Sequence, residues 1–139
     1  LIEQKKELAN NVISRDEEVN RKYFMIVRQL RVAVQDSILA RRLNITAVRA
    51  LDYRLVVKSI ELVADYAVAM AKNVLKILGK PISKKIKDII VKIGDLTSQI
   101  LENAMKALFQ NRMELSLKVV SMRQEMKKKR STAWIDLQR

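Results

Sequence analysis

The chain has 139 residues, of which 49% are apolar and 31% charged, with two glycines and one proline. These proportions exclude a fully disordered chain and a turn-rich β protein, and they are typical of long helices. The sequence has no cysteine and no histidine, which excludes disulfides, thiolate or imidazole metal sites and histidine-dependent nucleophiles. A net charge of +13 favours an anionic partner, unless it belongs to a solvated surface only.

Apolar spacing predicts the first two helices. Residues 1–13 have a helical pattern. Ser14 and Glu17 then have the spacing of a capping box, so we expect a new helix to begin near Arg15. Its apolar stripe fades at 41–42, where two arginines suit a helix C-terminus. The stripe consists of Val19, Ile26, Leu30 and Ala33.

Two further helices follow. Asn44 or Thr46 is expected to cap a helix that runs to Leu78, where the sequence Gly-Lys-Pro at 79–81 ends it. Ser83 opens another helix that passes Leu108, and residues 110–111 bend or end it. Its predicted core stripe is Ile86, Ile90, Ile93, Thr97, Ile100, Ala104 and Leu108. The short connections predict an all-α fold, an antiparallel bundle of about four long helices. No apolar stretch of about 18 residues is present, so no transmembrane helix is expected.

An internal repeat organises this pattern. Residues 7–19 read ELANNVISRDEEV and residues 114–126 read ELSLKVVSMRQEM, and identical or conservative residues stand in register. Ser121 with Gln124 repeats the capping-box spacing of the first copy. We interpret this as duplication of a three-helix unit, with residues 1–79 forming one copy whose first helix is incomplete. Residues 80–139 would begin the second copy, packed in the same bundle, and the chain would be part of a longer gene product.

Two segments now show a resemblance to a known family. The run 14–20 resembles the acidic opening of the second helix of PhoU domains, and 60–71 resembles their Leu-Glu-Arg-Ile-Gly-Asp-His-Ala-x-Asn-Ile-Ala signature. The resemblance implies two three-helix repeats and negative control of phosphate uptake through a phosphate-sensing kinase or the phosphate transporter. It also implies a cytoplasmic location, and archaeal relatives can add a DNA-binding module.

The resemblance also implies a possible metal site, because acidic pairs four residues apart bind metal clusters in this family. Glu61 and Asp65 match this spacing, and Asp16 matches the start of the motif in the second helix, although Asn20 replaces its second acid. Glu17, next to Asp16, is a further candidate ligand. Carboxylates four apart share a helix face and can share a divalent or iron-type ion. Other family positions differ here, with Leu62, Tyr66, Ala69 and Lys72 replacing Arg, His, Asn and Glu. A metal ion is the only cofactor that the resemblance implies, and we favour the alternative that flanking lysines neutralise these acids, with Lys58 pairing with Glu61.

The basic run Lys127, Lys128, Lys129 and Arg130 is a candidate contact for nucleic acid or another anion. The alternative, which we favour, is a helix C-terminal stretch whose cations complement the helix dipole. Trp134 could stack on a base, although a packing or subunit contact is the commoner use of a lone tryptophan.

Together with the helical pattern, the resemblance to PhoU domains implies a non-enzymatic regulator of phosphate uptake or phosphate signalling that acts through protein–protein contact. The acidic residues 16, 17, 61 and 65 are its expected docking surface. Catalysis has little support, because the paired carboxylates lie on a regular helix without a glycine-rich loop. The alternatives are a DNA-associated transcriptional regulator and an architectural module that forms homo-oligomers.

Overall fold

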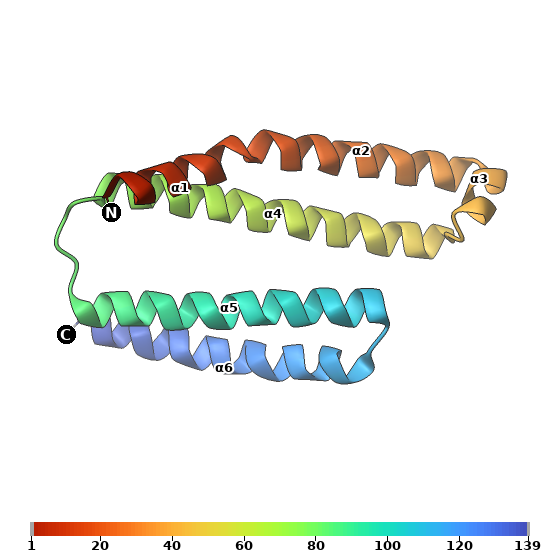
Figure 1. The fold of residues 1–139 in the computed structure, drawn as a ribbon. Coiled ribbons are helices and arrows are strands. Elements are labelled where there is room, and N and C mark those ends of the chain that lie inside the picture. The colour runs from red at the N-terminus through yellow and green to blue at the C-terminus, as the bar shows by residue number, and fades with distance from the viewer. Residues whose placement is uncertain (1, 139) are drawn as a thin grey trace. The chain divides into compact units, whose positions relative to one another are not determined.

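In the computed structural model, the backbone of residues 2–138 and the side chains of residues 3–133 are described. Helices follow one another along the chain, and no strand occurs in residues 2–138 (Figure 1). Their bounds are α1 Ile2–Ser14, α2 Asp16–Gln35, α3 Ser37–Arg42, α4 Ala47–Ile77, α5 Lys84–Gln110 and α6 Met113–Gln138. The predicted all-α fold class is therefore confirmed.

The chain divides into two compact units. Unit 1 spans Leu1–Lys80 and unit 2 spans Pro81–Arg139, so the division lies within one residue of the boundary predicted from the repeat. In unit 1, α1 and α2 pack along α4, whereas unit 2 is the hairpin of α5 and α6. That unit 2 begins a second repeat, in the same bundle as unit 1, stays a prediction.

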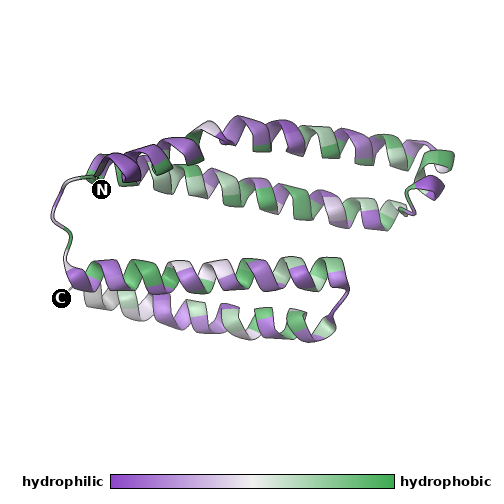
Figure 2. Ribbon diagram, in the orientation of Figure 1, coloured by the Kyte–Doolittle hydropathy of each residue, from purple (hydrophilic) through white to green (hydrophobic). Residues whose placement is uncertain are grey.

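The core of unit 1 lies between α4 and the helices α1 and α2. Four of its buried side chains are alanines, which allow the helix backbones to approach closely. The buried set is Ala9, Leu30, Ala33, Ala50, Val68 and Ala71. Figure 2 shows hydrophobic positions recurring along α4, and several lie away from this core, since Val48 and Leu55 are 69% and 70% exposed. One layer of neighbouring helices thus covers only part of the apolar surface of α4.

The junction between α1 and α2 differs from the predicted capping box. The Ser14 hydroxyl donates to the carbonyl of Asn11 at 3.0 Å instead of capping the next helix. Arg15 has helical backbone angles, and its amide donates to the same Asn11 carbonyl at 3.3 Å. Because the helical hydrogen bonds run through Arg15, the start of α2 needs no side-chain cap, and the capping-box prediction is wrong.

The predicted helix over 15–42 is also broken, at Asp36. This residue is extended, and its carboxylate accepts hydrogen bonds from the amides of Ile38 at 2.8 Å and Leu39 at 3.1 Å. Aspartate competes in this way with the helical ladder, so a short capped helix, α3, begins after it. The expected ending at Arg41 and Arg42 is confirmed, but for α3 and not for α2.

The remaining helix ends follow the sequence signals. The Thr46 hydroxyl accepts from the amide of Arg49 at 3.2 Å, and the Ser83 hydroxyl accepts from that of Ile86 at 3.3 Å. Gly79 has a φ of +82°, a left-handed conformation that glycine adopts at little cost. Asn111 ends α5 in the same region at +54°. The predicted caps of α4 and α5 are therefore confirmed.

In unit 2 the side chains that face α6 are not quite those predicted. Leu96 and Ala107 are buried, together with Met122 of α6, whose sulfur accepts from the Asn103 amide at 3.6 Å. Ile90 is 54% exposed, and Leu108 and Thr97 are also exposed. At two points the side of α5 that faces α6 is thus one position away from the predicted stripe, with Leu96 buried instead of Thr97 and Ala107 instead of Leu108.

The two repeat segments are both helical, and in each the serine donates to the carbonyl three residues earlier, as Ser14 does to Asn11 and Ser121 does to Lys118. Their inward faces differ. The first segment buries Ala9, whereas the second buries Met122, whose counterpart in the first copy is the exposed Arg15. The first segment packs against α4 and the second against α5, and neighbours that differ can bury different residues even in duplicated segments. The duplication therefore stays a prediction.

Candidate functional site

Glu61, the first of the predicted acidic residues, is held by a lysine. The Lys58 ammonium lies 2.5 Å from its carboxylate, and the Glu61 side chain is only 13% exposed. Lys58 also lies over the ring of Tyr23 from α2, 5.5 Å from the ring centroid. The hydrogen bond to Glu61 raises the pKa of Lys58 above its ordinary value. The ion pair that we favoured over a metal ligand is thus present.

The other three acidic residues lie apart from this pair. Asp65 is exposed, one turn beyond Glu61 on α4. Glu17 is 85% exposed and lies 3.8 Å from Arg21, on the solvent side of α2. Asp16 faces α4 in a hollow of about 230 Å³ that Ala64 and Val68 also line. Tyr23 on α2 contacts Lys58 on α4, and the two helices are antiparallel (Figure 1). Asp16 lies about two turns before Tyr23 and Asp65 about two turns after Lys58, so the two acids are at the same level of the helix pair.

These positions bear on the metal prediction in two ways. One Asp16 carboxylate oxygen, Oδ1, is buried without a hydrogen-bond partner, as an unfilled ligand would be. Against this, no three acidic side chains among the described residues gather closely enough to hold one ion. Glu61 is also already neutralised by Lys58. Metal binding by these four residues therefore stays a prediction.

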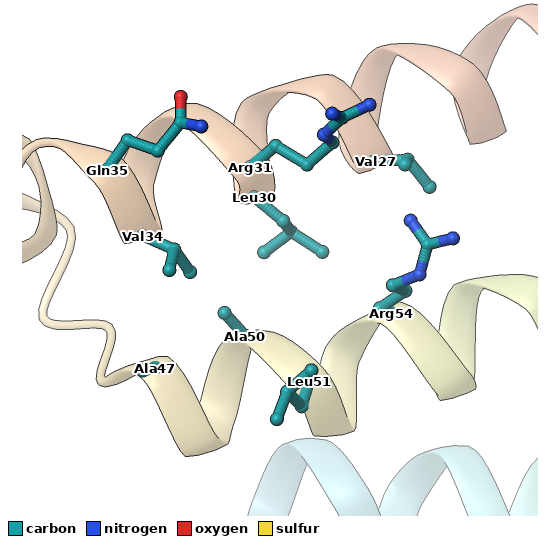
Figure 3. Close-up of a pocket in the computed structure, with 9 residues that line it drawn as sticks. All are labelled: Val27, Leu30, Arg31, Val34, Gln35, Ala47, Ala50, Leu51 and Arg54. Atoms are coloured by element: carbon teal, nitrogen blue, oxygen red, sulfur yellow. The ribbon is translucent and has the colours of Figure 1, made fainter.

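A second feature, missed by the sequence analysis, is an amphipathic groove between α2 and α4. Its volume is about 480 Å³, and mostly apolar side chains form its floor (Figure 3). Leu30 and Ala50 are buried at its base, whereas Val34 and Leu51 are 53% and 64% exposed. Figure 3 shows Arg31 on α2 and Arg54 on α4 at the rim, both pointing toward the end of the groove near Val27.

A signal for this groove was present in the sequence, although it was not used. Every basic residue between Lys22 and Lys58 is an arginine, and the only acids in that stretch are Asp36 and Asp52. Arginine presents a planar, bidentate donor set that matches carboxylates and phosphates better than lysine does. The six arginines are Arg28, Arg31, Arg41, Arg42, Arg49 and Arg54.

The basic run of unit 2 lies within α6 and is solvent-exposed. Lys129 pairs with Glu125 at 2.7 Å, one turn earlier. Because α6 continues to Gln138, Lys127, Lys128 and Arg130 precede its last turn, and the helix-dipole explanation does not apply to them. Contact with nucleic acid or another anion therefore stays a prediction for this run. The side chain of Trp134 lies outside the described residues.

None of the helices in the described part of the chain is long and apolar enough to cross a membrane. Comparisons with curated proteins and with solved structures gave no match. A family model described as PhoU domain matches residues 1–74. This segment contains α1 to α3, most of α4 and both runs on which the resemblance rests. Because the match covers more than half of the 139 residues, the chain belongs to the PhoU domain family.

Proposed function

We propose that this protein is a non-enzymatic regulator of phosphate uptake or phosphate signalling that acts by protein–protein contact. The observation that carries the proposal is the family match over residues 1–74, because PhoU domains belong to a phosphate-uptake regulatory family. By the same family relation, we propose a phosphate-sensing kinase or a phosphate transporter component as the partner. A cytoplasmic location agrees with partners of this kind.

The surface of unit 1 supports a function in binding other proteins. Large apolar side chains remain accessible on α4, among them Val48, Leu55 and Tyr66, which are 63–70% exposed. Exposed apolar groups of this kind, bordered by charged ones, are typical of protein interaction surfaces. The acidic residues 16, 17, 61 and 65 also lie on unit 1, where Asp65 and Glu17 are open to a basic partner.

Deleting the gene in its source organism tests the regulatory proposal. Uptake of labelled phosphate by cells in phosphate-rich medium should rise on deletion and return to normal on complementation. Uptake that deletion leaves unchanged, in phosphate-rich and in phosphate-poor medium, would refute it. Binding of the purified chain to the purified kinase or transporter ATPase, measured by surface plasmon resonance, then identifies the partner. Absence of binding to both would refute the proposed partners.

Homo-oligomer formation is a second candidate function, and the exposed apolar side chains of α1 and α4 favour it. Leu8 and Met70 are 65% and 62% exposed, and both line an apolar hollow of about 390 Å³ that a second copy could cover. Sedimentation equilibrium tests this candidate directly. A dimer that dissociates in Met70→Glu supports it, and a monomer at all concentrations refutes it.

Two proposals concern ligands. Elemental analysis of purified protein tests for a bound metal, and Asp16→Asn, which keeps the shape of the side chain, should lower any metal content. No metal in the unmodified protein would remove the hypothesis. For the basic run in α6, DNA binding should weaken steeply as salt rises, because released counterions drive such binding. A chain that binds no DNA at low salt would exclude the DNA-associated alternative.

A further inference from the structure

The groove between α2 and α4 has the shape and the lining of a helix-binding site. Its α2 wall runs from Val27 to Gln35, a rise of about 12 Å, or roughly two helical turns. Val34 and Leu51 present apolar surface to solvent from opposite walls, above Leu30 and Ala50. Two antiparallel helices that form such a trough can receive the apolar face of a third helix.

The charges at the groove are of one sign. The Arg31 and Arg54 side chains come from opposite walls and point toward the same end, near Val27 (Figure 3). Neither forms an ion pair with another side chain in the described region. The acids closest in sequence do not line the groove, and the carboxylate of Asp36 instead caps α3. Two unpaired guanidinium groups above an apolar floor make this end complementary to a carboxylate.

We propose that this groove binds an acidic amphipathic helix of a partner protein. Apolar side chains of that helix, spaced at i, i+3, i+4 and i+7, would cover Val34 and Leu51. Carboxylates at one end of the helix would accept hydrogen bonds from Arg31 and Arg54. The inference rests on the proposed function, since it names the kind of partner segment through which protein–protein contact occurs.

An acidic helix fits the groove better than other anionic partners do. A nucleic acid needs cations distributed along its phosphate backbone, and it makes no use of an apolar trough. Here the two groove arginines gather at one end, and the lining beyond them is mostly apolar. An anionic lipid shares the chemistry of a charged group beside an apolar chain, so vesicles form a separate arm of the test.

The first experiment uses a designed peptide as the probe. It is a labelled amphipathic helix of about 15 residues with leucines at the spacing above and glutamates on its flanks. Its matched control has glutamine in place of every glutamate. Fluorescence anisotropy with the full chain should show saturable binding of the glutamate peptide, at least about tenfold tighter than that of the glutamine peptide. Equal affinity of the two peptides, or no saturation up to about 1 mM, would overturn the proposal.

Variants of the chain then locate the site. The double change Arg31→Glu with Arg54→Glu should weaken binding of the glutamate peptide by at least about a hundredfold, since each arginine supplies a charge-assisted contact. Its matched control is Arg28→Glu with Arg49→Glu, which alters the net charge equally at exposed positions outside the groove. This control should lose no more than about threefold. Equal losses in the two double variants would show a general charge effect and overturn the assignment.

The apolar floor has its own matched pair. Leu51→Asn should weaken peptide binding about tenfold, whereas Leu55→Asn, at a 70% exposed position outside the groove, should leave it unchanged. Both leucines are largely exposed, so these variants should keep the helix content of the unmodified chain, as circular dichroism can verify. Vesicles with about 30% phosphatidylserine provide the lipid arm. Vesicle binding that depends on Arg31 and Arg54, without peptide binding, would overturn the proposal in favour of a lipid.

Phosphate uptake distinguishes failure of this inference from failure of the proposed function. In cells, a chain with Arg31→Glu and Arg54→Glu should behave like the deletion strain. If it restores normal uptake while the deletion raises uptake, the groove is not the partner site but the regulatory function stands. If the deletion itself leaves uptake unchanged, the proposed function fails, and the peptide experiments alone decide what the groove binds.

Discussion

Truncation of Leu30 tests how much the contact between α2 and α4 stabilises unit 1. Leu30 is 8% exposed and is one of the larger buried side chains in a core that consists mainly of alanines. Leu30→Ala removes three carbon atoms from the contact with α4, at about 0.8 kcal/mol each. Because the side chain also lines the open groove, water can enter the space it leaves, and the additional cavity cost should be small. We expect the free energy of unfolding to fall by about 2.5 kcal/mol.

The aromatic residues provide a signal for each unit. All three tyrosines, Tyr23, Tyr53 and Tyr66, lie in unit 1, and Trp134 in unit 2 is the only tryptophan. Tyrosine absorbance during urea unfolding should therefore report on unit 1. For a unit of this size, a slope near 1 kcal/mol per molar urea converts the expected loss into a midpoint lower by roughly 2.5 M.

Leu55→Ala is the matched control for this experiment. It makes the same chemical change on α4, at a position that is 70% exposed, so the loss in free energy of unfolding should stay below about 1 kcal/mol. If Leu30→Ala lowered the urea midpoint by no more than Leu55→Ala does, the assignment of the core to the α2–α4 contact would be refuted.

Three further predictions concern local structure and pH. Replacing Asp36 by Ala should cost about 1 kcal/mol in α3, because two amides lose their cap, and hydrogen exchange should then speed up in α3 but not in α4. Gly79→Ala should destabilise by about 1 kcal/mol because φ is +82°, whereas Gly94→Ala, inside α5, should stabilise by about 0.5–1 kcal/mol. Neither new methyl group meets an atom within 4 Å, so a urea titration in which both changes act in the same direction would contradict the backbone explanation. The hydrogen bond from Lys22 lowers the pKa of Glu18. The pair therefore stabilises the fold at pH values above the ordinary glutamate pKa, and this stabilisation is lost as the pH falls through the lowered pKa. Carboxylate NMR of Lys22→Met should show the pKa of Glu18 returning toward 4.5.

Much of the fold could be predicted from the sequence because helix ends depend on nearby residues. Thr46, Ser83 and Asn111 act on backbone groups within a few positions, and the structure places each at the predicted end. The errors are also local. Ser14 has the spacing of a capping box but sits in continuous helical backbone, and Asp36 interrupts a stretch whose apolar pattern alone appeared continuous. At both positions the side chain can bond to the backbone of the preceding helix or cap the following one, and the local sequence is compatible with either hydrogen bond.

The burial of each helix was harder to predict. Ile90 and Leu96 are both apolar and both lie on α5, yet one is 54% exposed and the other 8%. Periodicity finds an apolar stripe, but when the stripe is wider than one neighbouring helix can cover, it does not select the buried edge. The rotation of each helix against its neighbour makes that selection.

Some features of the candidate site could likewise be predicted from the sequence, whereas others depend on how the helices pack. The sequence alone determined the helical class, most helix ends, the acidic pair of Glu61 and Asp65 and the motifs of the PhoU domain family, since each is written in residues close together in the chain. Only the tertiary structure decided that the Lys58 ammonium, which pairs with Glu61 as predicted, also lies over the ring of Tyr23 on another helix. It also decided that Arg31 and Arg54 share one end of a groove (Figure 3). Such contacts join residues on different helices, and they exist only once α2 and α4 have packed at one particular rotation and register.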